Sequence, residues 1–249
     1  MGDRDLTFPG GKVRLYVEAA LGEGARVPAS PPQAHYLLHV MRARTGDRVS
    51  LFNGRDGEWL ARIAEAGRRD CVAVCERQSA TQTGDDDLWL VFAPIKKTPA
   101  DYLAQKATEL GVRALQPVVT RRTIVQRINT GRLRANAIEA AEQSGRLTVP
   151  EIRAPLPLET LLAEWPRERA LLFCDEAGAP PIREALAHAP QKSWAVLTGP
   201  EGGFDETERA GVRALPSAVP VSLGKRILRA DTAALAALAI LQAQWPNGL

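Results

Sequence analysis

The sequence has few of the residues that indicate a disulfide-stabilised, zinc-binding or membrane-spanning protein. Its 249 residues include only three cysteines, Cys71, Cys75 and Cys174, which are too few and too scattered for a disulfide framework or a four-ligand zinc site. No apolar run reaches the roughly 18 residues that a transmembrane helix requires. The segment from Met1 to Gly11 lacks the apolar stretch of a signal peptide. We therefore expect a soluble, cytoplasmic protein with no metal and no membrane partner.

The cysteines have a simpler interpretation. In an extended strand, Cys71 and Cys75 would lie on the same face because side chains alternate between the two faces of a sheet. We expect all three cysteines to be buried as small hydrophobic side chains.

Net charge is also low, at +3, but it is unevenly distributed. Residues 96–153 carry 11 basic and 5 acidic side chains, whereas residues 154–249 carry 9 and 11. No acidic residue lies between Arg113 and Arg134, a stretch that also contains Arg121, Arg122, Arg127 and Arg132. Such a stretch suits a surface that follows RNA phosphates, and it equally suits a solvated helix and loop. Charge alone leaves both interpretations open.

The first third of the chain has a β-like pattern. Short apolar runs are separated by turns such as Asn53 to Gly57, which predicts a small β-barrel or sandwich. The expected strands are 13–17, 48–52, 58–63 and 71–75. A helix from about Pro32 to Arg42 interrupts them and places His35 and His39 on one face. That pair can hold a metal, but no further ligand lies nearby at matching spacing, so packing or RNA contact is favoured.

Beyond a polar, acidic segment at residues 79–87, which we interpret as a linker, strands alternate with helices. This alternation predicts an α/β domain with a largely parallel sheet, so we expect two domains, 1–84 and 85–249. The expected strands are 88–93, 114–119, 170–174, 194–198 and 220–223. The expected helices are 99–110, 133–144, 181–187, one beginning at Asp205 with a capping box to Glu208, and an Ala- and Leu-rich helix at 232–245 that should be buried.

Two glycine-containing segments follow the last two of these strands. Glycine lets backbone amides approach a ligand, and ligands of open α/β sheets bind at the carboxyl ends of the strands, so residues 197–204 and 223–232 predict a composite pocket. Neither nucleotide-binding glycine motif is present, and Pro200 removes an amide that a phosphate loop would use. The glycines could also serve only to shape tight turns.

At these segments the sequence resembles a known family. LTGPEGGF at 197–204 and LGKRILRADTA at 223–233 closely resemble the paired signature of the RsmE family, the 16S ribosomal RNA uridine-N3 methyltransferases of the SPOUT superfamily. Similar motifs occur in the same order upstream, at 39–47, 105–112 and 139–146.

The resemblance implies an N-terminal PUA-like RNA-binding barrel and a C-terminal α/β domain with a deep trefoil knot. It implies a homodimer that uses S-adenosylmethionine to methylate N3 of one uridine in 16S ribosomal RNA. The segment 173–176 would form a further wall of the pocket. The cofactor-binding residues implied by the resemblance are Leu197, Thr198, Gly199, Pro200, Gly202, Gly203, Leu223, Gly224, Ile227, Leu228 and Ala230. The implied RNA contacts are Arg14, His39, Arg42, Arg122 and Arg146.

The reaction indicates which residues to examine as catalytic. Uracil N3 must lose its proton before it can attack the methyl group, so the site needs a proton acceptor or a group that stabilises the anion. Arg229 can stabilise negative charge on the uracil oxygens, and Asp231 or Glu201 can take the proton. Alternatively, Arg229 forms an ion pair with one of these carboxylates, Asp231 caps the last helix, and Glu201 is a solvated loop residue.

Two positions depart from the family pattern. Asp231 stands where Glu is usual, and Arg121 stands where an acidic residue commonly precedes the equivalent of Arg122. The first change puts in doubt any role that needs the longer side chain, and the second strengthens the basic surface. Other functions remain open at this point: a knotted methyltransferase with another RNA target, or a ribosome-assembly factor that binds RNA without catalysis.

Overall fold

The computed structural model describes residues 13–94, 97–124, 128–175, 177–187 and 193–243. They divide into two compact units, the first made of residues up to Gly84 together with 141–149, and the second of 85–140 with 150–249. Segment 141–149, which the sequence division assigned to the second domain, belongs to the first unit. It is held there by Arg14, which donates hydrogen bonds to the carbonyl oxygens of Ala141 and Arg146, both at 2.6 Å.

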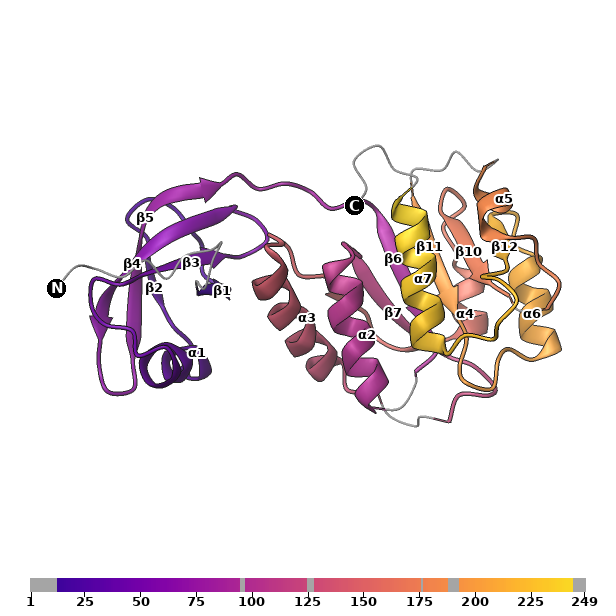
Figure 1. Cartoon of the computed structure of the whole chain (residues 1–249), viewed down its shortest axis with the longest axis horizontal. Coiled ribbons are helices and arrows are strands. Elements are labelled where there is room, and N and C mark those ends of the chain that lie inside the picture. The colour runs from indigo at the N-terminus through magenta and orange to yellow at the C-terminus, as the bar shows by residue number, and fades with distance from the viewer. Residues whose placement is uncertain (1–12, 95–96, 125–127, 176, 188–192, 244–249) are drawn as a thin grey trace. The chain divides into compact units, whose positions relative to one another are not determined.

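The first unit is built on a mixed five-stranded sheet, which confirms the small β-structure expected from the sequence (Figure 1). The strand order is open, β1-β3-β4-β5-β2, with β1 and β3 parallel and the other pairs antiparallel. Cys71 and Cys75 face the core and are buried, as predicted. The strands are β1 Arg14–Tyr16, β2 Arg26–Pro28, β3 Arg48–Phe52, β4 Glu58–Ala66 and β5 Cys71–Ala80.

The expected helical insertion is present, and it is irregular. Helix α1 covers Pro31–His35, with a capping box between Ser30 and Gln33, and continues as a π-helix, η1, over Tyr36–Val40. The chain then leaves the helix at Arg42, whose φ of 53° is the one positive value among the described non-glycine residues.

The second unit contains the predicted parallel sheet, in the order β12-β10-β11-β6-β7-β8, with β9 paired to β7. Neighbouring strands of this sheet are parallel in every pair, including β7 with β9. The strands are β6 Leu88–Phe92, β7 Ala114–Val119, β8 Glu151–Ile152, β9 Leu156–Pro157, β10 Ala170–Cys174, β11 Trp194–Thr198 and β12 Ala218–Val221.

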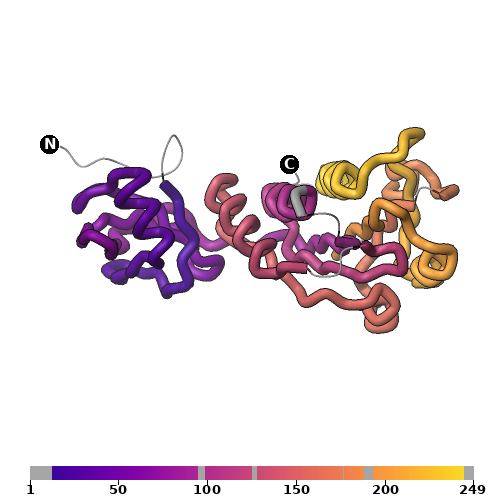
Figure 2. The backbone as a smooth tube through the Cα atoms, turned by 90° about the horizontal axis from the view of Figure 1, so that it is seen from below, coloured from indigo at the N-terminus to yellow at the C-terminus, as the bar shows by residue number. Residues whose placement is uncertain are grey.

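Helices cover both faces of this sheet. Alternate strand residues point to opposite faces, so Leu90, Leu172 and Val196 pack with α2, α5 and α7, whereas Leu171 and Leu197 pack with α4 and α6. Helices α2 and α7 lie side by side (Figures 1 and 2). The helices are α2 Lys97–Glu109, α3 Thr130–Ser144, α4 Leu158–Ala163, α5 Ile182–Leu186, α6 Glu206–Arg213 and α7 Ala230–Gln242. No described helix has the length and apolar character needed to cross a bilayer.

The topology brings three strand ends together. Strand β10 lies between β11 and β12, and all three are parallel, so their carboxyl ends share one edge of the sheet. After β12 the chain returns to α7, which contacts β11 and α2. The predicted trefoil knot stays a prediction.

Candidate functional site

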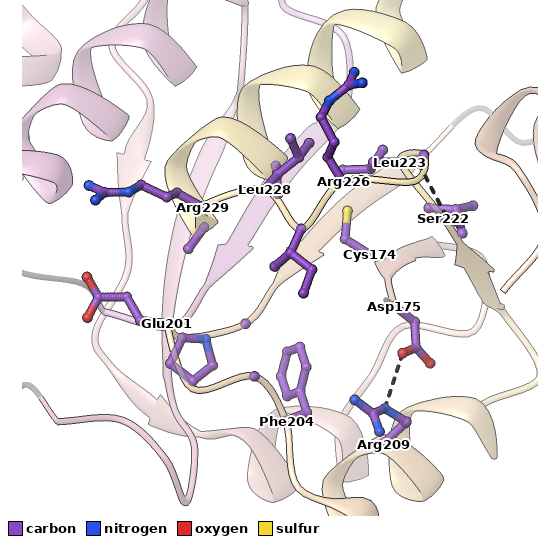
Figure 3. A pocket seen from close by; sticks show the side chains of 18 of the residues that line it. Cys174, Asp175, Glu201, Phe204, Arg209, Ser222, Leu223, Arg226, Leu228 and Arg229 are labelled. Carbon is purple, nitrogen blue, oxygen red and sulfur yellow. Dashed lines mark hydrogen bonds and ion pairs between the residues drawn. The ribbon is translucent and has the colours of Figure 1, made fainter. Parts of the chain in front are cut away.

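A cavity of about 700 Å³ opens where the carboxyl ends of β10, β11 and β12 meet (Figure 3). This is the edge at which open α/β sheets bind ligands, and the volume is that of a small-molecule site. It is lined by residues from all three strand ends and from α2, α6 and α7: Pro99, Cys174, Asp175, Gly199, Pro200, Glu201, Gly203, Phe204, Arg209, Val221 to Ala230 and Ala233.

The wall after β11 depends on a glycine. A Cβ atom on Gly199 would lie only 2.7 Å from Cε2 of Phe204, which is closer than real Cβ contacts. The Phe204 ring is buried and packs edge-on against Phe173, with ring centroids 5.2 Å apart. Gly203, with a φ of 68°, closes the turn by donating its amide to the carbonyl oxygen of Pro200 at 2.9 Å. The absence of a side chain on Gly199 therefore lets the loop fold back over this ring.

The wall after β12 is cationic and exposed. Gly224 has a φ of 115°, which only glycine adopts readily, and its amide faces the Ser222 hydroxyl at 3.3 Å. The three cations that follow, Lys225, Arg226 and Arg229, are all exposed at the rim. Ile227 is 86% exposed between them. Figure 3 shows Arg226 and Arg229 pointing away from the cavity centre.

The third wall follows β10 and is fixed by buried charge. Asp175 is 2% exposed, and its carboxylate pairs with Arg209 at 3.1 Å and with Arg213 at 2.7 Å, both from α6 (Figure 3 shows the first pair). Cys174 lies beside it, packs half-buried against the core and lines the cavity, so it is less buried than Cys71 and Cys75. Desolvation raises the pKa of the Cys174 thiol to about 12, which keeps it protonated at neutral pH.

The structure places most of the predicted cofactor residues around the cavity. Eight of them line it: Gly199, Pro200, Gly203, Leu223, Gly224, Ile227, Leu228 and Ala230. Leu197 and Thr198 are buried within β11, where the Leu197 side chain joins the core on the α4 and α6 face. Gly202 lies outside the lining and contacts Arg122 instead.

The predicted catalytic residues separate into two groups. Arg229 and Glu201 line the cavity, whereas Asp231 is not among the lining residues. Asp231 is not the N-cap of α7 either, because the helix begins at Ala230 and Arg229 occupies the cap position. Its carboxylate accepts the amide of Thr232 at 2.9 Å. Figure 3 shows no ion pair between Arg229 and Glu201.

The RNA contacts implied for the first unit also need a correction. Arg14 is 4% exposed, forms an ion pair with Glu58, and covers the ring of Phe52 at 3.8 Å. The burial of Arg14 argues against a contact with RNA, because the N–H donors of its side chain already bind Glu58 and the carbonyl oxygens of Ala141 and Arg146. His39 and Arg42 are exposed, and Arg146 is partly exposed. The rings of His35 and His39 lie 4.9 Å apart, and the described residues contain no cluster of three or more metal-ligating side chains.

Sequence reasoning missed several lining residues as individuals. Phe204, Lys225 and Arg226 lie inside the two glycine segments, so their position in these motifs could have identified them as lining residues. Arg209 gave no signal, since it reaches the cavity from α6 only through its pairing with Asp175.

Comparisons with known proteins identify the family. A family model described as an RNA methyltransferase domain matches residues 83–242, and one described as an RNA methyltransferase PUA domain matches 30–75. Ribosomal RNA small subunit methyltransferase E of Rickettsia conorii is 31% identical over 229 residues, covering 91% of this chain and 93% of the relative. The protein of the same name from Synechocystis is 33% identical over 224 residues, covering 88% and 73%.

A solved structure shows the same likeness in three dimensions. Ribosomal RNA small subunit methyltransferase E of Neisseria gonorrhoeae, bound to S-adenosylmethionine, has a TM-score of 0.86 and 30% identity, and the match covers 94% of this chain and 98% of that one. The sequence-based family prediction is confirmed: this chain belongs to the ribosomal RNA small subunit methyltransferase E family.

Proposed function

We propose that this protein transfers a methyl group from S-adenosylmethionine to N3 of a specific uridine in 16S ribosomal RNA. The observation that carries the proposal is the cavity at the ends of β10, β11 and β12, walled by the two glycine segments, in a chain whose relative from N. gonorrhoeae binds S-adenosylmethionine. Because Gly199 and Gly224 present no side chain, backbone groups can approach a ligand of this size closely. The residues present therefore fit the cofactor.

The cofactor, when bound, supplies the electrophilic methyl carbon, and the protein's residues bind and orient the reactants. Gly199, Pro200, Gly203, Leu223, Gly224, Ile227, Leu228 and Ala230 would hold it. Leu197, Thr198 and Gly202 would support these loops from behind. Arg229 would stabilise the negative charge that develops on the uracil oxygens as N3 loses its proton.

Glu201 is the better candidate for the proton acceptor. It lines the cavity, whereas Asp231 does not and already accepts a backbone amide. We therefore expect E201Q to slow single-turnover methylation by about a hundredfold or more, within the range of general-base catalysis, and D231N to have a smaller effect. Equal rates for wild type and E201Q would exclude this role.

The RNA would be bound by basic side chains of each unit that are at least partly exposed. His39, Arg42 and Arg146 are the candidates in the first unit, and Arg122 is the candidate in the second. We further propose that the substrate lies in the small ribosomal subunit, that the protein acts in the cytoplasm as a homodimer, and that the second unit is knotted. Light scattering on the purified protein tests the dimer.

The function itself is tested with small ribosomal subunits, labelled S-adenosylmethionine and nucleoside analysis. Label in 3-methyluridine supports the proposal. Label in another nucleoside would identify a methyltransferase with a different target. Binding of RNA without cofactor binding, measured by calorimetry, would identify an assembly factor.

A further inference from the structure

The turn between β7 and the basic stretch is built by two threonines. The amide of Thr120 donates to Oγ1 of Thr123 at 2.9 Å, the two hydroxyls lie 2.8 Å apart, and the amide of Thr123 donates to the carbonyl oxygen of Thr120 at 3.1 Å. Thr120 is buried, so it anchors this turn to the sheet. Arg121 and Arg122 consequently lie at the tip of a closed turn with a defined direction.

That tip contacts the cavity wall that follows β11. Nη1 of Arg122 donates to the carbonyl oxygen of Gly202 at 2.9 Å, and the Arg122 side chain lies over the Cα face of the same glycine. Gly202 directly precedes the lining residues Gly203 and Phe204. The Arg122 contact therefore acts on a residue that is next to the cavity but outside it.

The same tip also holds the start of α6. Nη1 of Arg121 pairs with the Asp205 carboxylate at 2.9 Å, and the Arg121 amide donates to Glu208 at 2.7 Å. These carboxylates form the capping box of α6, and Glu208 also accepts the Asp205 amide. The Glu208 amide, and with it Arg121, lowers the pKa of Asp205, so this carboxylate is ionised at neutral pH.

The segment 202–205 is thus held at both ends from one turn. A glycine-containing loop loses much conformational freedom when it is fixed, so contacts that restrict it before the ligand arrives reduce the entropy that binding must overcome. Arg122 limits the position of Gly202, and Arg121 limits the position of Asp205, with the wall residues Gly203 and Phe204 between them.

We propose that Arg121 and Arg122 are positioning residues for the cofactor, which fix the 199–204 wall of the cavity by contacts made outside it. This inference rests on the proposed function for the identity of the ligand. It assigns to two residues of the basic stretch a role in cofactor affinity that is separate from any contact with RNA.

The test compares R122A and the double variant R121A/R122A with wild type, using R167A as the control. Arg167 is an exposed arginine that precedes β10, at the opposite edge of the sheet. Calorimetry with S-adenosylmethionine should show a Kd about three- to tenfold higher in R122A than in wild type, which corresponds to the loss of one net hydrogen bond. The Kd should be higher still in the double variant and unchanged in R167A. In steady-state assays at saturating RNA, the KM for the cofactor should rise in R122A and rise further in the double variant.

Hydrogen exchange supplies a readout that does not depend on activity. Without cofactor, amides in 199–204 should exchange faster in R122A, whereas amides in 222–228, the opposite wall, should not change. Unchanged cofactor affinity and exchange would overturn the inference, as would a general loss of thermal stability with faster exchange at both walls. A lowered kcat and weaker RNA binding at unchanged cofactor affinity would show that Arg122 contacts only the substrate. If wild type itself failed to bind S-adenosylmethionine, the proposed function would fail first.

Discussion

Gly199→Ala is the substitution whose effect follows most directly from the cavity's geometry. The new Cβ would lie 2.7 Å from Cε2, 3.0 Å from Cδ2 and 3.2 Å from Cζ of the Phe204 ring. Carbon atoms in contact prefer about 3.5–4.0 Å, so the ring or the loop must move by roughly 0.5–1 Å. The ring has little room, because it is buried and packed edge-on against Phe173. Overpacking of this kind costs about 1–3 kcal/mol.

Part of that cost should fall on the cofactor site, because both residues line it. We expect G199A to raise the Kd for S-adenosylmethionine about tenfold, the equivalent of 1.4 kcal/mol, when measured by calorimetry. Gly202→Ala is the matched control in the same loop. Its Cβ would meet only the Arg122 side chain at 3.5 Å, an ordinary contact, so the Kd should change less than about twofold.

A double-mutant cycle isolates the clash. Phe204→Leu removes the ring that the new methyl group meets, so G199A/F204L should bind the cofactor better than the sum of the two single changes predicts. Additive effects, or a G199A protein that binds as tightly as G202A, would refute the explanation that Gly199 is required by the proximity of the ring.

Four further predictions concern stability and reactivity. Asp175→Asn leaves two arginines of α6 without their buried carboxylate and should lower the free energy of unfolding by about 2–3 kcal/mol in urea titrations. Gly211→Ala should instead stabilise the protein by about 0.5–1 kcal/mol in the same titrations, because alanine favours a helix over glycine. The new Cβ would lie 3.8 Å from Leu162, an ordinary van der Waals contact. Hydrogen bonds from Arg48 and then Arg62 lower the pKa of Glu76 in the folded protein. Ionised Glu76 therefore stabilises the fold at pH values above its pKa in the unfolded chain, and this stabilisation is lost as the pH falls through its pKa in the folded protein. In acid titrations, the free energy of unfolding of E76Q should lack this pH-dependent decrease. Desolvation raises the pKa of Cys174 to about 12, so little of this thiol is ionised at pH 8.5, and mass spectrometry should find iodoacetamide labelling of Cys174 at least about tenfold slower than that of an ordinary thiol, because the higher nucleophilicity of its thiolate offsets only part of the loss.

The strands that the sequence predicted best are those with strong local signals. Bounds for β3, β7, β10 and β11 agree with the structure, because each is an apolar run ended by polar or glycine residues. The missed strands β2, β8 and β9 have two or three residues, too few for any periodicity. Their pairing is decided by neighbouring strands, which a local pattern does not contain.

The two glycine segments alone predicted a pocket, and the residues assigned to the cofactor came from the family resemblance. Gly199 and Gly224 are required to be glycine by a close approach and a positive φ, which the sequence alone could not distinguish from ordinary tight turns. Arg14 was mispredicted because its partners, Glu58 and the carbonyl oxygen of Ala141, are distant in the sequence. The alternative role of Asp231 as a helix cap was wrong because α7 begins at Ala230, two residues before the expected start at 232, a shift within the usual uncertainty of helix ends.

We propose that the cavity at the ends of β10, β11 and β12 directs a methyl group to N3 of uridine in 16S ribosomal RNA. Small ribosomal subunits from a strain that lacks this protein, incubated with the purified protein and labelled S-adenosylmethionine, test it most directly. The predicted result is label in 3-methyluridine at one position, reduced about tenfold in G199A when the cofactor concentration lies well below the Kd. Absence of labelled 3-methyluridine, with a folded protein that binds the cofactor, would contradict the claim.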